Sequence, residues 1–500
     1  MSLAIVHTRA LMGISAPAVS VEVHLSNGLP AFTIVGLPET AVRESKDRVR
    51  SALLNSHFEF PQRRITVNLA PADLPKEGGR FDLAIALGIL AASEQVPSDK
   101  LDDHEFVGEL ALSGDIRAVR GAIPTAIASS SVNHSLVLPC ANNNEASLCQ
   151  STNILLADNL LKVCAYLHQR ADLDPPSKPN IVETHYPKDL SEVKGQLHAR
   201  RALEIAATGG HNILLYGPPG TGKSMLASRL PSVLPTMEEH EALDVASIRS
   251  LTRETTAAHW HIRPYRSPHH SSSAAALVGG GSRPSPGEIS LAHKGVLFLD
   301  ELPEFPRHVL EVLREPMESG HICISRAAAQ VEYPADFQLV AAMNPCPCGF
   351  HGDASGKCLC TPPQVKRYRD KISGPLLDRI DLHVHVKSLP IAELQQSPEG
   401  ESSATVRERV CVNRASQIQR QGVTNAALDG KGLQAHCALN EGEKSLLATA
   451  IDRLKLSARA YDRILRVART IADMSDSANI QKHHLNEALS YRNLDRRTPV

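Results

Sequence analysis

The segment from Gly217 to Ser224 has the residue types and spacing of a phosphate-binding loop. Its residues are Gly217, Pro218, Pro219, Gly220, Thr221, Gly222, Lys223 and Ser224, which match the pattern G-x-x-x-x-G-K-S/T. Glycines let the backbone N–H groups point at phosphate oxygens, and the following helix adds its positive N-terminal end. Lys223 is predicted to reach the β- and γ-phosphates, and the Ser224 hydroxyl to hold Mg²⁺. An ordinary Gly/Pro turn is the alternative, which the flanking strand and helix patterns disfavour.

Two carboxylates follow a continuous apolar run further along the chain. Gly295–Leu299 has the composition of a strand buried on both faces of a parallel sheet, and Asp300 and Glu301 come directly after it. Asp300 is predicted to complete the Mg²⁺ shell. Glu301 is predicted to polarise the attacking water, which favours hydrolysis over transfer of the phosphoryl group to a substrate. A solvated pair of strand-end carboxylates is the alternative.

A third apolar run, Phe337–Met343, ends at Asn344. Ligands of open α/β sheets bind at the carboxyl ends of the strands, so Asn344 is a further candidate for the nucleotide site. The sequence contains no Asn-Lys-x-Asp motif for reading guanine. ATP is therefore the predicted nucleotide.

Four cysteines directly after Asn344 have the spacing of a metal site that is separate from the nucleotide. They are Cys346, Cys348, Cys358 and Cys360. Four thiolates brought together suit tetrahedral, structural Zn²⁺ with no open water position. A redox-active or disulfide pair, or no metal at all, remain alternatives because the spacing departs from the commoner Cys-x-x-Cys knuckle.

Composition limits the class of protein. The chain has 500 residues, 42% of them hydrophobic, and a formal net charge of −1, which suggests roughly three domains. This charge excludes a globally basic nucleic-acid binder, so contacts with DNA or RNA must come from local basic patches. The longest apolar segment, Phe81–Ala92, is too short to span a bilayer, and the first residues lack the layout of a signal peptide. Ten cysteines without a secreted disulfide framework predict a reducing, cytoplasmic compartment.

The chemical groups require an α/β scaffold with a parallel sheet. A helix is predicted over Leu190–Ala207 with Ser191 as its N-cap. The Gly- and Pro-rich segment from Arg263 to His293 is predicted to be an insertion loop outside the sheet, with Arg283 near its tip. His321–Tyr333 alternates as a hairpin with Arg326 near its turn. Arg283 and Arg326 are candidate nucleic-acid contacts, and ordinary surface positions are the alternative.

The first 170 residues have a different pattern, typical of an α+β domain. We predict a β-hairpin from Val19–Leu25 and Ala31–Val35 about the Asn27–Gly28 turn. A helix over residues 39–55, a strand over Arg64–Leu69 and a buried helix from Phe81 follow. Residues 171–190 are polar and proline-rich, which indicates a semi-rigid linker.

This N-terminal part resembles the proteolytic domain of Lon-type proteases, which has a ribosomal S5 domain 2-like fold. The resemblance rests on Pro75–Gly79 before a helix, and on Gly114–Gly121 leading to Ser135–Pro139. The serine of the family's turn falls at Arg80, and the lysine of its dyad falls near Ile123. Since nucleophile and base are both missing, the resemblance implies a non-catalytic domain.

The C-terminal part is predicted to be helical. A polar connecting segment begins near Ser388, a helix covers Thr405–Gln421, and a last helix lies around residues 483–492. A further helix has an apolar face that consists of Leu456, Ala460, Ile464, Val467 and Ile471. Arg459, Arg463 and Arg466 form a basic stripe beside this face, and we expect Arg463 and Arg466 to be solvated.

Residues 268–305 and Ser373–Asp381 resemble the magnesium-chelatase-like branch of AAA+ ATPases. Joined to a Lon-like domain, the whole chain resembles the ComM/YifB family. The resemblance implies an ATP-driven hexameric DNA helicase that moves branch points during natural transformation, with ATP sites between subunits. It also implies that Asn344 is the sensor-1 residue, Arg379 the arginine finger and Arg459 the sensor-2 residue. A local ion pair with Asp378 or Asp381 is the alternative for Arg379.

The predicted architecture has four parts. They are a Lon-like domain over residues 1–170, a linker over 171–190, an AAA+ core over 191–386 with a zinc loop at 345–361, and a connecting segment with a helical lid over 387–500. The predicted function is an ATP-hydrolysing homo-oligomeric ring, a motor on single-stranded and branched DNA. A protein-remodelling chaperone is the second hypothesis. A metal-inserting ATPase of the chelatase kind is the third, disfavoured by the additional N-terminal domain.

Overall fold

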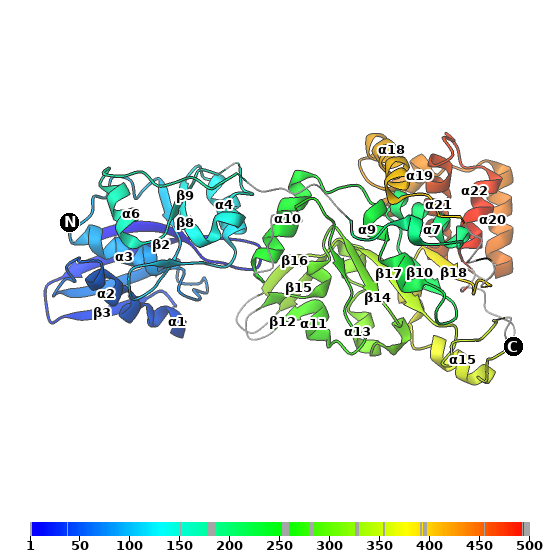
Figure 1. Cartoon of the computed structure of the whole chain (residues 1–500), viewed down its shortest axis with the longest axis horizontal. Coiled ribbons are helices and arrows are strands. Elements are labelled where there is room, and N and C mark those ends of the chain that lie inside the picture. Colours follow the sequence, from blue (N-terminus) through cyan, green and yellow to red (C-terminus); the bar gives the residue numbers. More distant parts are fainter. Residues whose placement is uncertain are drawn as a thin grey trace.

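The computed structural model of the chain contains two main sheets and a group of C-terminal helices (Figure 1). It describes residues 3–37, 39–150, 152–178, 186–252, 260–280, 284–325, 330–353, 356–390, 393, 398–454, 456–492 and 494. We call residues 3–178 the N-terminal region, 186–390 the nucleotide-binding region, and 398–494 the lid region. No helix among the described residues is both long and apolar enough to cross a membrane.

The N-terminal region contains a seven-stranded sheet in the order β3-β4-β2-β1-β5-β8-β9. Its strands are β1 (Leu3–Arg9), β2 (Ala18–Ser26), β3 (Ala31–Val35), β4 (Arg64–Ala70), β5 (His104–Phe106), β8 (Ser135–Pro139) and β9 (Ile154–Ala157), and a separate pair is β6 (Glu109–Leu110) and β7 (Ile116–Arg117). The predicted β2–β3 hairpin is wrong. β4 lies between the two strands, antiparallel to β2 and parallel to β3, because the chain passes through a helix before it returns to the sheet.

The N-terminal region contains the helices predicted over residues 39–55 and from Phe81, together with further helices that were not predicted. The helices are α1 (Thr40–Arg43), α2 (Ser45–Asn55), α3 (Asp82–Ala92), α4 (Ala122–Ser130), α5 (Asn143–Ala146) and α6 (Leu160–Leu167). The single helix predicted over residues 39–55 is divided near Glu44 into α1 and α2. Every residue of α3 is buried, as the apolar run from Phe81 predicts. α3 packs beneath β1 and β2 and so forms the centre of this core.

The nucleotide-binding region is organised around a five-stranded parallel sheet in the order β11-β14-β17-β10-β18. Its strands are β10 (Ile213–Tyr216), β11 (Tyr265–Arg266), β14 (Val296–Leu299), β17 (Gln338–Met343) and β18 (Leu382–His385). The strands predicted before the phosphate loop, Asp300 and Asn344 are confirmed. They are neighbours, so the three chemical segments meet at one sheet edge.

Two predictions about the flanking segments need correction. α7 begins at Leu197, with Gln196 in a left-handed conformation as its N-cap, so Ser191 does not cap it. The segment from Arg263 to His293 is not wholly outside the sheet, because Tyr265–Arg266 pairs with β14 as an edge strand. The predicted hairpin is confirmed as β15 (His321–Ser325) and β16 (Gln330–Pro334).

Short helices connect the strands of the nucleotide-binding region. They are α7 (Leu197–Gly209), α8 (Lys223–Ala227), α9 (Leu230–Val233), α10 (Glu239–Ser250), α11 (Ala274–Val278), α12 (Glu288–Leu291), α13 (Arg307–Glu311), α14 (Pro316–Ser319), α15 (Pro362–Arg369) and α16 (Gly374–Leu377), with a small ladder of β12 (Gly279–Gly280) and β13 (Ser285–Pro286). This ladder is separate from the main sheet. It therefore fits the predicted insertion.

The N-terminal and nucleotide-binding regions share an apolar junction. Helix α4 packs against α10, and Trp260 is buried in the same cluster. The Gly121 N–H donates to the Ser250 carbonyl across the junction at 3.2 Å. A second contact joins the β1–β2 connection to β16, where a Cβ added at Gly13 would lie 2.4 Å from Val331 Cγ1. The two regions therefore pack directly on each other.

The described residues of the lid region form five α-helices, which cover one side of the nucleotide-binding region (Figure 1). They are α18 (Ser403–Gln421), α19 (Gly430–His436), α20 (Glu441–Leu454), α21 (Ala458–Asp473) and α22 (Lys482–Ser490). The predicted apolar face of α21 is confirmed. The prediction that Arg463 and Arg466 are solvated is wrong. Arg463 donates to Asp381 at 2.5 Å and Arg466 to the Leu428 carbonyl at 2.7 Å, so both anchor α21 inward.

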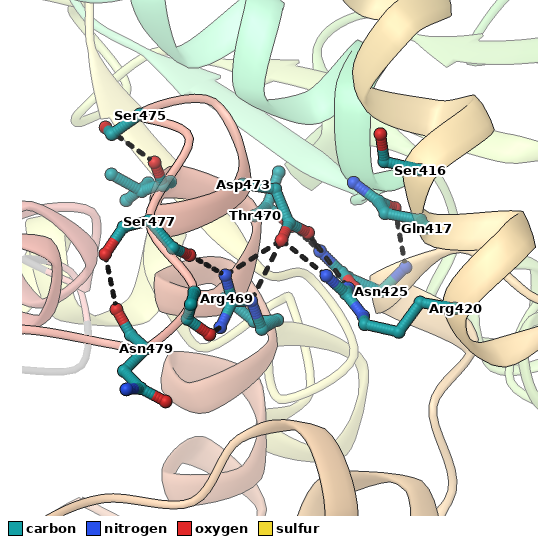
Figure 2. Close-up of polar contacts among 12 residues, drawn as sticks. Ser416, Gln417, Arg420, Asn425, Arg469, Thr470, Asp473, Ser475, Ser477 and Asn479 are labelled. Carbon is teal, nitrogen blue, oxygen red and sulfur yellow. Dashed lines mark hydrogen bonds and ion pairs between the residues drawn. The ribbon is translucent and has the colours of Figure 1, made fainter.

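A buried carboxylate joins three segments of the lid region (Figure 2). Asp473, at the end of α21, accepts hydrogen bonds from Arg420 of α18 at 2.6 Å, from Arg469 at 3.0 Å and from the Asn425 amide at 2.8 Å. The Asn425 amide also reaches the Thr470 hydroxyl, which lies 2.7 Å from His211 Nε2 beside β10. This polar cluster therefore ties the lid to the sheet.

Replacing Asp473 by Ala should destabilise the protein, because two arginines lose their shared carboxylate. Breaking a buried ion pair from one side costs about 3–5 kcal/mol. We expect the thermal unfolding midpoint of Asp473→Ala to fall by several degrees. Ser416→Ala is the matched control, since among the described residues this exposed hydroxyl bonds only to the Val412 carbonyl of its own helix. Equal midpoints for the two variants would contradict the role of Asp473.

Candidate nucleotide-binding site

The phosphate loop lies between β10 and α8, as predicted. Lys223 is buried, and its ammonium donates to the carbonyls of Gly217 at 2.8 Å and Pro218 at 2.9 Å. It also donates to Asn344 Oδ1 at 3.1 Å. Gly220 and Gly222 have φ values of 77° and 91°, which L-residues rarely adopt. The loop is therefore built as the sequence predicts, with Lys223 and Asn344 facing each other.

The charge of Lys223 is balanced by nearby carboxylates. Burial lowers the pKa of the Lys223 ammonium, and the negative charges of Asp300 and Glu301 oppose this effect. A phosphate placed in the loop would offer the ammonium a stronger anionic acceptor than the backbone carbonyls it now contacts. Lys223 is thus held in place by acceptors that a nucleotide can replace.

Asp300 and Ser224 are paired at the end of β14. The Ser224 hydroxyl donates to Asp300 Oδ2 at 2.6 Å, and the Glu301 N–H donates to Asp300 Oδ1 at 2.9 Å. A hydroxyl and a carboxylate at this distance are the oxygen ligands that Mg²⁺ prefers beside phosphates. The predicted Mg²⁺ ligands are therefore brought together.

Glu301 projects from a constrained backbone position. Its φ of 52° is unusual for a residue other than glycine, and such conformations concentrate at functional sites. His270, from the segment before α11, places Nδ1 at 3.1 Å from Glu301 Oε2. The sequence motif around His270 signalled a family resemblance but gave no reason to assign it to this carboxylate. His270 is therefore a site residue that the residue-by-residue reasoning missed.

Arg379 has a local partner other than the two predicted alternatives. Its guanidinium pairs with Glu318 at the end of α14 and donates to the Pro375 carbonyl at 2.7 Å. Burial lowers the pKa of Arg379, and the positive charges of Arg314 and Arg459 add to this effect. Arg459 lies exposed in the first turn of α21.

Arg379 does not pair with Asp381, because the Asp381 carboxylate already has other partners. This buried carboxylate accepts from the Asn212 N–H at 3.0 Å and from Arg463 at 2.5 Å. Burial alone would raise the pKa of Asp381, but the charge of Arg463 and the His211 hydrogen bond hold it well below its usual range. Asp381 therefore fastens α21 to the sheet.

The four predicted metal ligands converge. The sulfurs of Cys346, Cys348, Cys358 and Cys360 all lie within 4.8 Å of one another, and none forms a disulfide. Measured separations are 3.4 Å for Cys346–Cys348, 3.8 Å for Cys346–Cys358 and 3.7 Å for Cys348–Cys358. A tetrahedral site with Zn–S bonds of about 2.3 Å places its sulfurs roughly 3.8 Å apart. The donors therefore fit zinc.

A groove beside the phosphate loop was not predicted. It has a volume of ≈ 510 Å³ and is lined by residues that include Leu190, Gly195, Leu197 and Val406. Gln196, between two of these residues, donates to the Thr221 carbonyl of the phosphate loop at 3.4 Å. Gln196 therefore links the groove to the phosphate loop. The candidate nucleic-acid residues Arg283 and Arg326 lie outside the described residues.

The parallel sheet, the phosphate loop on β10 and the acidic pair after β14 define the class as a P-loop nucleotide-binding core. Family models agree with this class. The model for magnesium chelatase, subunit ChlI, matches residues 189–394. The models for subunit ChlI of Mg-chelatase and for the ChlI C-terminal region match residues 21–142 and 400–492.

Some curated relatives match along almost the whole chain, and others match a part of it. The protein YifB of Escherichia coli K12 is 52% identical over 498 residues, which cover 99% of this chain and 98% of YifB. Competence protein ComM of Haemophilus influenzae Rd is 52% identical over 501 residues and 98% of each chain. The magnesium-chelatase 38 kDa subunit of Cereibacter sphaeroides is 24% identical over 334 residues, which cover 61% of this chain and 92% of that subunit. The chain belongs to the ComM/YifB family of magnesium-chelatase-like proteins.

Proposed function

We propose that this protein is an ATP-hydrolysing, hexameric DNA motor that promotes branch migration during natural transformation. The carrying observation is the convergence of Lys223, the Ser224–Asp300 pair and Glu301 at one sheet edge. The likeness to a competence protein over almost the full chain supports uptake-related DNA as the substrate. The proposed DNA is single-stranded or branched.

Each residue of the site has a defined task in this proposal. The backbone N–H groups of residues 217–224 and the Lys223 ammonium bind the phosphates. Ser224 and Asp300 hold Mg²⁺, which neutralises charge on the β- and γ-oxygens when bound. Glu301 accepts the proton of the attacking water, and Asn344 orients the γ-phosphate. The groove lined by Gly195 and Leu197 receives the base, since Gln196 connects it to the loop.

Arg379 completes the site of a neighbouring subunit in this proposal. An arginine supplied in trans stabilises charge that develops on the γ-phosphate, and so makes hydrolysis depend on assembly. Arg379 is now held by Glu318. When the ring forms, Arg379 must therefore leave the Glu318 carboxylate and contact the γ-phosphate bound by the neighbouring subunit. Arg459, exposed in the first turn of α21, is the proposed sensor-2 residue.

The proposed domain boundaries are those predicted from the sequence. Residues 1–170 form a Lon-like domain without peptidase chemistry, because Arg80 occupies the position of the nucleophile and donates to Thr125 Oγ1 at 2.8 Å. Residues 191–386 form the AAA+ core, and 387–500 the connecting segment and lid. The Cys346–Cys360 loop holds structural Zn²⁺. The free thiols agree with a cytoplasmic location.

The proposal is tested by ATP turnover and strand displacement with forked and four-way DNA, compared with an unfolded protein as the substrate. We expect DNA to stimulate turnover, and stimulation to weaken as salt increases, because phosphate contacts release counterions. Lys223→Ala is the inactive control. The double variant Arg283→Ala/Arg326→Ala should keep basal turnover and lose the stimulation. Stimulation by unfolded protein, with no effect of DNA, would instead establish the chaperone.

A further inference from the structure

The loop that carries the four cysteines touches the nucleotide site. Gly349 lies between Cys348 and Phe350, is buried, and donates its N–H to the Cys346 carbonyl at 3.0 Å. A Cβ built on Gly349 would lie 2.8 Å from Pro219 Cδ and 3.9 Å from Asn344 Cγ. The backbone of this loop therefore rests on the phosphate loop and beside the Asn344 side chain at once.

The two contacted residues belong to the machinery around Lys223. Pro219 follows Pro218, whose carbonyl accepts from the Lys223 ammonium, and Asn344 Oδ1 accepts from the same ammonium. The backbone of Gly349 has a φ of 87°, a conformation that only glycine adopts at low cost. A small displacement of this one residue would thus reach two of the groups that hold Lys223.

The cysteine sulfurs fix the conformation of the loop on both sides of Gly349. Cys346 and Cys348 precede it in sequence and Cys358 and Cys360 follow it, and the Cys346 sulfur also accepts a hydrogen bond from the His351 N–H at 3.3 Å. After the last ligand, Thr361 caps α15 through a capping box with Gln364. The loop is therefore anchored at the ligands and at the start of α15, whereas Gly349 provides its contact with the phosphate loop.

We infer that the four-cysteine centre is a structural part of the ATP site, with Gly349 as a positioning residue that transmits its order to Pro219 and Asn344. This inference rests on the proposed ATPase function and deepens it. Zinc at the four sulfurs holds Gly349 against the phosphate loop. Loss of the metal should then weaken nucleotide binding although no cysteine contacts the nucleotide.

Glycines of the same loop provide a matched comparison. Gly352 has a φ of 77°, and a Cβ added there meets nothing within 4 Å. Gly349→Ala and Gly352→Ala therefore introduce similar backbone strain into one loop, but only the first also clashes with Pro219. The difference in nucleotide binding and turnover between the two variants therefore reports the contact of residue 349 with Pro219, separately from the backbone strain that both variants share.

The full-length protein and both variants are measured for zinc content, affinity for a fluorescent ATP analogue and ATP turnover. We expect about one zinc per chain in all three. We expect at least about tenfold lower turnover and weaker nucleotide binding in Gly349→Ala than in Gly352→Ala, since misplacing a site by about 1 Å can cost 10²-fold. Removing zinc with a chelator, followed by restored Mg²⁺, should weaken nucleotide binding by the wild type but add little to Gly349→Ala.

Three results overturn the inference. They are a zinc content well below one per chain, equal nucleotide affinities of the two glycine variants, and wild-type affinity that survives zinc removal. A failure of the proposed function gives a different result. The wild-type protein would then not bind ATP, and the Lys223→Ala variant would have the same turnover as the wild type.

Discussion

Glu301→Gln is expected to lower ATP turnover by about 10²–10⁴-fold, the usual contribution of a general base, while the variant still binds ATP. The amide keeps the size of the carboxylate but cannot accept the proton of the attacking water. Lys223 and the Ser224–Asp300 pair remain intact, so nucleotide affinity should change little. Single-turnover hydrolysis and fluorescent-nucleotide binding separate the two effects.

Glu304→Gln is the control for Glu301→Gln. Glu304 lies on the turn after β14, but its carboxylate faces Lys371 at 3.2 Å. It should keep nearly full turnover. If Glu301→Gln hydrolysed ATP as fast as Glu304→Gln, another group would have to be the base, and His270, 3.1 Å from Glu301, would be the first to examine.

Arg379→Ala is expected to reduce turnover of the assembled protein by about 10³-fold or more, the range measured for arginines supplied to a γ-phosphate. Binding of ATP to the same chain should persist, because the Arg379 guanidinium contacts Glu318 and the Pro375 carbonyl and not the phosphate loop. Glu318→Gln is the companion variant. It removes the local carboxylate and should leave turnover equal or higher, since Arg379 is then released more easily.

Mixing two inactive variants tests whether Arg379 acts on a neighbour. Lys223→Ala subunits keep Arg379, and Arg379→Ala subunits keep an intact phosphate loop. Mixed rings should therefore recover part of the activity that neither variant has alone. No recovery in rings shown to be mixed, or single chains that hydrolyse ATP as fast as rings, would refute action in trans.

The sequence predicted the parts of the site whose signals are local. The phosphate loop, the strand before Asp300 and the four cysteines each form one short segment, so spacing alone indicated their chemistry. Parallel pairing of buried strands then required the segments to meet. The β2–β3 hairpin failed for the opposite reason, because a two-residue turn signal cannot show that β4, far along the chain, enters between the strands.

The sequence also could not predict which side chains far apart in the chain form ion pairs. Arg463 looked like one member of a solvated stripe, yet its partner Asp381 comes from a strand end far from it in the chain. Arg379 has two acidic neighbours in sequence, yet it pairs with Glu318. Periodicity identifies which face of a helix is apolar but not which distant carboxylate approaches the other face. The contact of His270 with Glu301 was unpredictable in the same way.

The apolar junction of α4, α10 and Trp260 has a mechanical consequence. Prying the two regions apart would wet the chain's single tryptophan together with Ile123 and Val245, which lie in the same cluster. A hinge at this place is therefore costly, so any tilt of α10 would carry the N-terminal sheet along with it. The N-terminal region is therefore a rigid extension of the nucleotide-binding region and not a domain on a flexible linker.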